Sequence, residues 1–157
     1  MVTSKAPAAV VFEGDKWLRL HRQGKLNSPT DLLLALSNKW YRLNTLYKIK
    51  DKDGKVCTFQ PNKQQRERFI RGHCRNIILK ARQLGFTTHE MLDALDDCLF
   101  IDNFAAGCIA HALEDAKDIF RNKIKFAYDE LRKGPWVSIF ESIGLRLPRP
   151  TSDRGQA

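Results

Sequence analysis

The turn between Leu79 and Thr88 carries the residue types that phosphate binding requires. It consists of Leu-Lys-Ala-Arg-Gln-Leu-Gly-Phe-Thr-Thr. A phosphate-binding loop needs a flexible glycine so that backbone N–H groups approach a phosphate. It also needs a following helix N-terminus, a nearby cation and a hydroxyl for Mg²⁺. Because Gly85 and Thr87 have the spacing of the glycine and the hydroxyl in the usual loop, this turn predicts binding of a nucleotide phosphate with Mg²⁺.

The turn departs from the usual loop at two positions. Phe86 occupies the place of the lysine, and Lys80 occupies the place of the first glycine. Lys80 and Arg82 can supply the cation, since a side chain that reaches inward from the start of the loop approaches the same phosphates. On spacing alone, a basic strand-to-helix turn that binds no ligand remains open as the alternative.

Two strands and a helix are predicted to position this turn. The apolar runs Asn76–Leu79 and Ala105–Ala110 are typical of short buried strands. Between them, apolar residues recur at helical spacing from Met91 to Leu99. We therefore expect an α/β unit in which Ile77–Leu79 and Gly107–Ile109 are neighbouring parallel strands and the Thr88–Leu99 helix crosses between them. A further helix is predicted from Leu113 to Leu131.

Helices and a hairpin are predicted before this unit. The first 28 residues show no long periodic pattern, although Trp17, Leu18 and Leu20 suit a short helix. Ser28-Pro29-Thr30-Asp31 is typical of a helix start, and helical spacing continues to Leu43. The alternating runs 47–50 and 56–59 flank an Asp-Gly turn, which indicates a β-hairpin.

The chain has 157 residues and a net charge of +9, and this charge is uneven. Residues 1–58 hold 11 basic and 5 acidic side chains, a net charge of +6, which suggests contact with a polyanion such as nucleic acid. A solvated basic surface is the alternative. No stretch of the sequence approaches the roughly 20 consecutive apolar residues of a membrane span, and no signal peptide is recognisable. We therefore expect a cytoplasmic protein.

Four separated cysteines and four scattered histidines predict reduced, buried thiols and no metal site built from Cys and His.

Three regions are expected: a basic helical region with the hairpin (1–58), a nucleotide-binding core (59–133) and an irregular tail (134–157). The tail from Leu147 onward is rich in Pro, Arg, Ser and Gly, and we expect it to be disordered.

A wider set of residues resembles the ATPase domain of the large terminase subunit of tailed bacteriophages. The resemblance covers about Asn38 to Leu131, some 60% of the chain, and its most specific part is Lys80–Thr88. In that family the loop has the form Arg-Gln, one residue, Gly, one variable residue, then Ser or Thr, and its lysine can stand at the loop's start. The other matching segments are Leu46–Gly54, Phe59–Asn62 with Gln65, Arg75–Leu79, Gly107–His111 and Asp115–Phe120.

The resemblance implies a partial P-loop NTPase domain that binds ATP and Mg²⁺, with roles for individual residues. Lys80 and Arg82 would meet the phosphates next to Gln83, and Gly85 would let the backbone approach them. Thr87 would ligate Mg²⁺ through its hydroxyl, and Thr88 would help to close the first helical turn. Gln65 best matches the glutamine near the adenine. Gln64 and Gln60 are alternatives, and so is a surface role for Gln65.

The resemblance also implies partners: double-stranded DNA of a phage genome, a portal protein, a small terminase subunit and further copies of the chain in the full-length motor, in the bacterial cytoplasm. It stops short of a complete enzyme. After Ala110 no apolar strand ends in Asp-Glu, and Asp129-Glu130 lies within a predicted helix as a solvated face. No nuclease domain is recognisable. We therefore expect the N-terminal part of such a subunit, from a truncated gene, a frameshifted product or a shortened chain, without ATPase activity of its own.

Two function classes stay open. The first is a subunit of the DNA-packaging motor, represented by its N-terminal portion. The second is a non-catalytic module that binds nucleotide or nucleic acid, as a remnant or a regulator. The missing acidic strand favours the second for the chain as it stands. A basic helical DNA-binding protein is a poorer third interpretation, because it leaves the loop unexplained.

Overall fold

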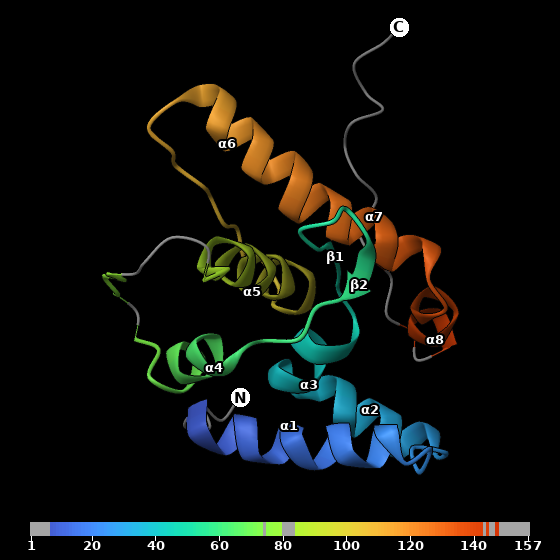
Figure 1. The fold of residues 1–157 in the computed structure, drawn as a ribbon. Coiled ribbons are helices and arrows are strands. Elements are labelled where there is room, and N and C mark those ends of the chain that lie inside the picture. The colour runs from blue at the N-terminus through green and yellow to red at the C-terminus, as the bar shows by residue number, and fades with distance from the viewer. Residues whose placement is uncertain (1–6, 74, 80–83, 143, 145–146, 148–157) are drawn as a thin grey trace, which may run out of the picture.

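The computed structural model describes residues 7–73, 75–79, 84–142, 144 and 147, and this part of the chain is mostly helical (Figure 1). Its elements, in chain order, are α1 Pro7–Arg22, α2 Pro29–Ser37, α3 Lys39–Thr45, β1 Lys48–Lys50, β2 Val56–Thr58, α4 Lys63–Ile70, α5 Phe86–Phe100, α6 Leu113–Ile119, η1 Phe120–Lys125, α7 Phe126–Lys133 and α8 Trp136–Ser142. The segments α6, η1 and α7 run end to end as one rod. The predicted helix from Leu113 to Leu131 is thus confirmed, with a π-helical middle that the pattern did not predict.

The long helix α1 is the largest addition to the predicted elements. Its buried stripe is Val11, Gly14 and Leu18, which face α3 at the spacing of one helix surface. Val11 is fully buried in the core. The apolar pattern around this stripe is broken by Glu13, Asp15 and Lys16, so the sequence indicated only a short helix near Trp17.

The helix predicted from Ser28 to Leu43 is divided at Asn38. It starts as predicted, with the Ser28 hydroxyl accepting the Thr30 N–H at 3.3 Å. Asn38 is extended (φ −91°, ψ 116°), ends α2 and caps α3 by accepting the Tyr41 N–H at 3.0 Å. Its amide also donates to the Val10 carbonyl at 2.9 Å. One polar side chain therefore ends one helix, starts the next and fastens both to α1.

The predicted hairpin is confirmed. The antiparallel strands β1 and β2 pair Lys48 with Thr58 and Lys50 with Val56. The turn is closed by the Asp51 carboxylate, which accepts the N–H groups of Asp53 and Lys55 at 2.9 Å each. The turn also needs Gly54, whose φ of 78° lies in the left-handed region.

A buried ion pair joins α3 to α5. Arg42 donates from Nε and Nη2 to the Asp96 carboxylate, at 2.6 Å for Nη2, and Tyr47 donates to the same carboxylate at 2.7 Å. The Asp96 side chain is fully buried. Burial raises the pKa of Tyr47 well above its usual value, and the Asp96 charge adds to this rise. The network is satisfied by three partners and fixes α5, whose first turn follows the predicted phosphate loop.

The two predicted parallel strands are not formed in this structure. Ile77–Leu79 and Gly107–Ile109 are irregular, and the hairpin is the only sheet in the described residues. The side chains of Ile77, Leu79 and Ile109 are each more than 90% exposed. A parallel strand needs hydrogen-bonding neighbours and cover on both faces, and the described chain supplies neither to these segments. The wider expectation of a partial P-loop NTPase domain stays a prediction.

The expected state of the cysteines is partly corrected. Cys57, Cys98 and Cys108 are free thiols, as predicted, but Cys98 is exposed and the other two are half-buried. Cys98 lies on the solvent side of α5, where the helical pattern had placed it on the core face. Cys74 and residues 148–157 lie outside the described residues. The start of the region predicted as an irregular tail is instead helix α8, whose Phe140 is buried in the core.

Candidate nucleotide-binding site

Gly85 directly precedes α5 and has a left-handed backbone. Its φ is 70° and its ψ is 14°, and as a glycine it has no side chain to cap the helix. The first N–H groups of a helix have no partner within the helix and carry partial positive charge. A Cβ at this position would lie 2.8 Å from the Gln65 amide nitrogen. Both the left-handed backbone and the close approach therefore require glycine here.

Gln65 ties α4 to this glycine. Its amide oxygen accepts the Asn62 N–H at 2.8 Å, and its amide nitrogen donates to the Gly85 carbonyl at 2.9 Å. The Asn62 side chain completes the capping box by accepting the Gln65 N–H at 2.9 Å, and it also donates to the Leu84 carbonyl at 3.2 Å. Gln65 is buried, whereas Gln60 and Gln64 are exposed. The structure thus brings Gln65 to the turn before α5. Both ends of its amide are engaged by backbone groups, so its predicted place near the adenine stays a prediction.

The other predicted site residues differ in their exposure, and some of them are not described by the structure. Thr87 is exposed in the first turn of α5, and Thr88 is half-buried next to it. The Thr87 hydroxyl is therefore open to a ligand, as its predicted role requires. Lys80, Arg82 and Gln83 lie outside the described residues. Phe86, which stands at the place of the usual lysine, is buried.

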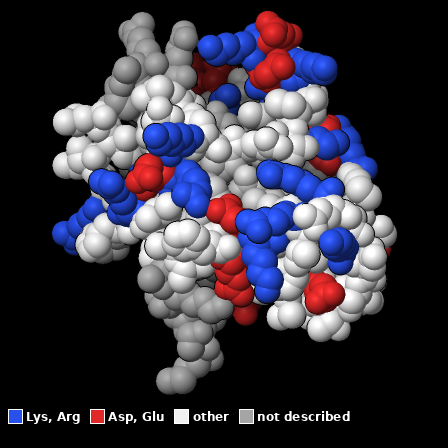
Figure 2. Space-filling view, turned by 60° about the horizontal axis from the view of Figure 1, so that its bottom comes forward, with Lys and Arg blue, Asp and Glu red and all other residues white. Residues whose placement is uncertain are grey.

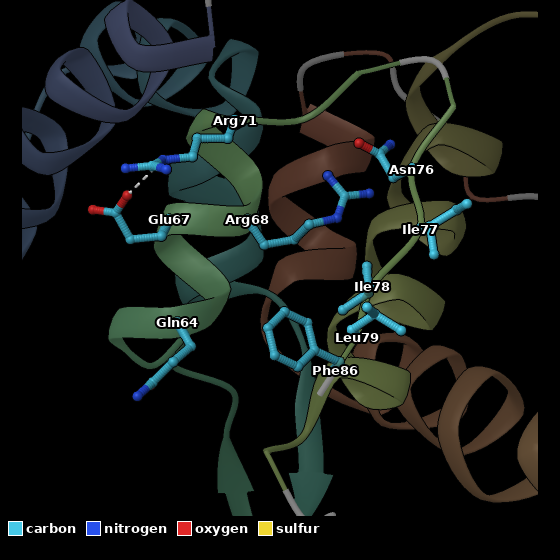
Figure 3. A pocket seen from close by; sticks show the side chains of 9 residues that line it. All are labelled: Gln64, Glu67, Arg68, Arg71, Asn76, Ile77, Ile78, Leu79 and Phe86. Carbon is cyan, nitrogen blue, oxygen red and sulfur yellow. Dashed lines mark ion pairs between the residues drawn. The ribbon is translucent and has the colours of Figure 1, made fainter. Parts of the chain in front are cut away.

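A groove lies beside the loop, between α4 and residues 76–79 (Figure 3). Its volume is about 700 Å³. Polar side chains of α4 and Asn76 contribute to its lining, together with Ile77, Ile78, Leu79 and Phe86. Arg68 extends from α4 toward the 76–79 segment, whereas Arg71 and Glu67 pair with each other on the other side of the helix. Arg68 is therefore the cation that extends into the groove, whose lining is partly polar and partly apolar.

Arg68 is held by α5. Its Nη2 donates to the Glu90 carboxylate at 2.9 Å, and the other carboxylate oxygen lies 3.2 Å from Nδ1 of His89. Burial acts to raise the pKa of Glu90, but its hydrogen bond to His89 and the charge of Arg68 outweigh burial, so that this pKa lies below its usual value. His89 is buried next to the rings of Phe59 and Phe69. Glu90 is therefore an anion at neutral pH and orients the arginine.

Sequence reasoning missed Arg68, Glu90 and the groove. A signal was present, because Gln65 and Arg68 stand three residues apart and Phe86 and Glu90 stand four apart, which places each pair on one helix face. The signal could not be used without knowing that α4 packs beside the start of α5.

The fit to Mg²⁺ is partial. The exposed Thr87 and the N-terminus of α5, whose first N–H groups attract anions, suit a phosphate-bound Mg²⁺. The described residues contain no group of three or more His, Cys, Asp or Glu side chains that could hold a metal. Asp129 and Glu130 lie on α7 and pair with Lys125 at 2.7 Å and with Lys133 at 3.1 Å. The expected solvated helix face is only partly found, because the Glu130 side chain is 18% exposed and also lies 3.7 Å from Nζ of Lys48 on β1.

None of the helices in the described ranges has both the length and the apolar character that a membrane crossing needs.

Comparison with known proteins gave no match to any family model, curated protein or solved structure.

Proposed function

We propose that the chain is the N-terminal part of the ATPase domain of a phage terminase large subunit and that it binds ATP with Mg²⁺ at the 79–88 turn. Lys80, Arg82 and Gln83 meet the phosphates, Gly85 lets the backbone approach them, and Thr87 offers its hydroxyl to the metal while Thr88 closes the first helical turn.

The hydrogen bond from Gln65 to the Gly85 carbonyl is the observation that carries this proposal. It joins two residues that are 20 positions apart and that the resemblance assigns to one nucleotide site. Gly85 is left-handed and directly precedes α5. The meeting of Gln65, a left-handed glycine and the N-terminus of α5 in one place supports the proposal.

Binding without turnover is the expected activity of this chain. Hydrolysis needs a group that orients the attacking water and an acidic group that holds the metal. Asp129 pairs with Lys125, and Glu130 pairs with Lys133 and with Lys48 of β1, so both acidic groups are engaged on α7 rather than beside α5. The second function class, a non-catalytic nucleotide- or nucleic-acid-binding remnant or regulator, is therefore the form in which this chain would act by itself.

The proposal includes the partners of a packaging motor. In the full-length protein these are double-stranded phage DNA, the portal protein, the small terminase subunit and further copies of the chain, in the cytoplasm of the bacterial host. The observation that supports DNA binding by this chain is the net charge of +6 in residues 1–58.

Isothermal titration calorimetry with Mg-ATP and Mg-ADP tests the nucleotide site. The parent chain should bind both at high micromolar concentration and release no phosphate over repeated turnovers. Lys80→Ala and Arg82→Ala should each weaken binding by about 1–3 kcal/mol, because each removes a charge-assisted hydrogen bond to phosphate. Phe86→Ala should have a much smaller effect on phosphate contact.

Lys52→Ala is the matched control, because it removes the same charge from the exposed hairpin turn. Its affinity should equal that of the parent. The proposal is wrong if the folded parent binds no nucleotide at millimolar concentration, or if Lys80→Ala and Arg82→Ala both bind as the parent does.

A further inference from the structure

Arg68 lies on the same face of α4 as Gln65, one turn further along the helix. Gln65 holds the Gly85 carbonyl, and Arg68 extends into the groove beside Phe86 (Figure 3). The arginine is therefore next to the residue that replaces the usual lysine of the loop. Arg68 belongs to α4, which precedes the loop in the chain, so the sequence of the loop alone does not reveal this further cation.

The guanidinium group of Arg68 is only partly engaged. Nη2 donates to Glu90 at 2.9 Å, whereas Nε is buried and has no hydrogen-bond partner in the described chain. A guanidinium carries five N–H donors in a planar fork, so a single carboxylate oxygen leaves most of them without an acceptor. Its side chain is 20% exposed, so the group is held in place and still reachable from the groove.

Arg71 does not share this position. It lies one turn from Arg68 on α4, but its side chain is 82% exposed and pairs with Glu67 of its own helix at 3.2 Å. Figure 3 shows the pair on the far side of α4 from residues 76–79. Arg68 is therefore the arginine that extends into the groove. It is oriented by Glu90, which lies one helical turn after Phe86 on α5.

We propose that Arg68 binds the polyphosphate of the nucleotide beside Phe86, as a cation in addition to Lys80 and Arg82. This inference rests on the proposed function of the 79–88 turn. Planar arginine donors match phosphate oxygens in pairs, and the partly buried Arg68 side chain holds its charge in a fixed position. Glu90 acts as a positioning residue, because it contacts the arginine and not the phosphate.

Calorimetry with Mg-ATP, inorganic tripolyphosphate and adenosine tests this assignment. Arg68→Gln should weaken the binding of Mg-ATP and of tripolyphosphate by the same factor, at least tenfold, and leave any adenosine binding unchanged. Arg121→Gln is the matched control, because Arg121 is 67% exposed on η1 and outside the groove. Circular dichroism and thermal unfolding check that each variant is folded.

A second measurement uses the parent chain alone and so does not depend on a variant that folds. Tripolyphosphate should protect Arg68 from the arginine reagent phenylglyoxal at least fivefold, as mapped by mass spectrometry, while Arg121 stays reactive. Equal modification of Arg68 with and without tripolyphosphate would overturn the assignment.

The outcomes separate this inference from the proposed function. If the parent binds Mg-ATP, Lys80→Ala weakens it and Arg68→Gln does not, the Arg68 assignment is wrong and the phosphate loop stands. If the parent binds neither Mg-ATP nor tripolyphosphate, both are wrong. Loss of adenosine binding in Arg68→Gln would place the arginine at the base rather than at the phosphates and would also overturn the assignment.

Discussion

At the scale of single residues, Gln65 connects the local structure of α4 to the candidate site. Its oxygen completes the capping box of α4 and its nitrogen holds the loop in front of α5. Both ends of the amide are therefore engaged by backbone groups, and the side chain is buried. A residue with this double role is expected to affect both the stability of the fold and the geometry of the loop.

Gln65→Glu separates these two roles. The new carboxylate can still accept the Asn62 N–H, but it places a negative oxygen against the Gly85 carbonyl instead of a donor. We expect the free energy of unfolding in urea to fall by about 1–3 kcal/mol, the cost of an unsatisfied buried polar group. The exposed neighbour Gln64 provides the control, and Gln64→Glu should stay within about 0.5 kcal/mol of the parent. Equal stability of the two variants would show that the contact to Gly85 contributes nothing.

Sequence reasoning predicted these site residues unequally. Gly85 and Thr87 follow from local spacing, because a glycine before a helix and a hydroxyl in its first turn are both sequence-local features. Gln65 followed only from the resemblance, and its contact with Gly85 spans 20 positions. Arg68 could not be predicted, since its role depends on the packing of α4 beside α5 and not on any spacing in the loop.

At the scale of elements, α1 and α3 pack closely because α1 carries a glycine at the contact. A Cβ on Gly14 would lie 2.6 Å from Oδ1 of Asn38 and 2.9 Å from Cδ1 of Trp40. The Asn38 oxygen cannot move freely, because it caps α3 through the Tyr41 N–H. The close approach of α1 to α3 thus depends on the absence of a Cβ atom at Gly14.

Gly14→Ala tests this packing. On an exposed helix face this change stabilises by up to about 1 kcal/mol, because alanine is the better helix former. Here we expect the free energy of unfolding to fall by about 1–3 kcal/mol, since the methyl group overfills the contact. Gly107→Ala is the control, with no atom within 4 Å of its Cβ, and it should change stability little. A stabilised Gly14→Ala variant would contradict the described contact between α1 and α3.

The elements also differ in how far local pattern could predict them. The hairpin and the 113–131 helix depend on near neighbours in sequence, and both are confirmed. The boundary at Asn38 depends on a cap that also bonds to Val10, 28 positions away. The strands predicted at Ile77–Leu79 and Gly107–Ile109 would need neighbouring strands to pair with. The described residues provide no such neighbours, and the side chains of Ile77, Leu79 and Ile109 are exposed.

At the scale of the whole molecule, charge is the property that suggests a macromolecular partner. The face in Figure 2 carries several Lys and Arg side chains with Asp and Glu among them. Part of the basic excess is used internally, since Arg42 and Lys39 pair with carboxylates of α5. Exposed cations remain at the end of α1 and after it, where Arg19, Arg22 and Lys25 follow one another within seven residues.

DNA binding should accordingly be weak, independent of sequence and steeply dependent on salt. For two neutralised phosphates, affinity should fall about tenfold between 50 and 200 mM salt, because counterions are released on binding. Fluorescence anisotropy with double-stranded DNA measures this. Arg22→Glu with Lys25→Glu should reduce affinity further, whereas Lys117→Glu with Arg121→Glu on the C-terminal rod should have a smaller effect. An affinity that does not change with salt would contradict an electrostatic contact.

If backbone N–H groups at the start of α5 bind a nucleotide phosphate, the amides there must respond to the ligand. The most direct measurement is a titration of the ¹⁵N-labelled chain with Mg-ADP and Mg-ATP, followed by amide NMR. We expect the largest shifts at Gly85 to Thr88 and smaller ones at Gln65 and Arg68, and we expect Lys80→Ala to need more ligand for the same shifts. Unchanged amides from Leu84 to Thr88 at millimolar nucleotide, or shifts concentrated in residues 1–58, would contradict it.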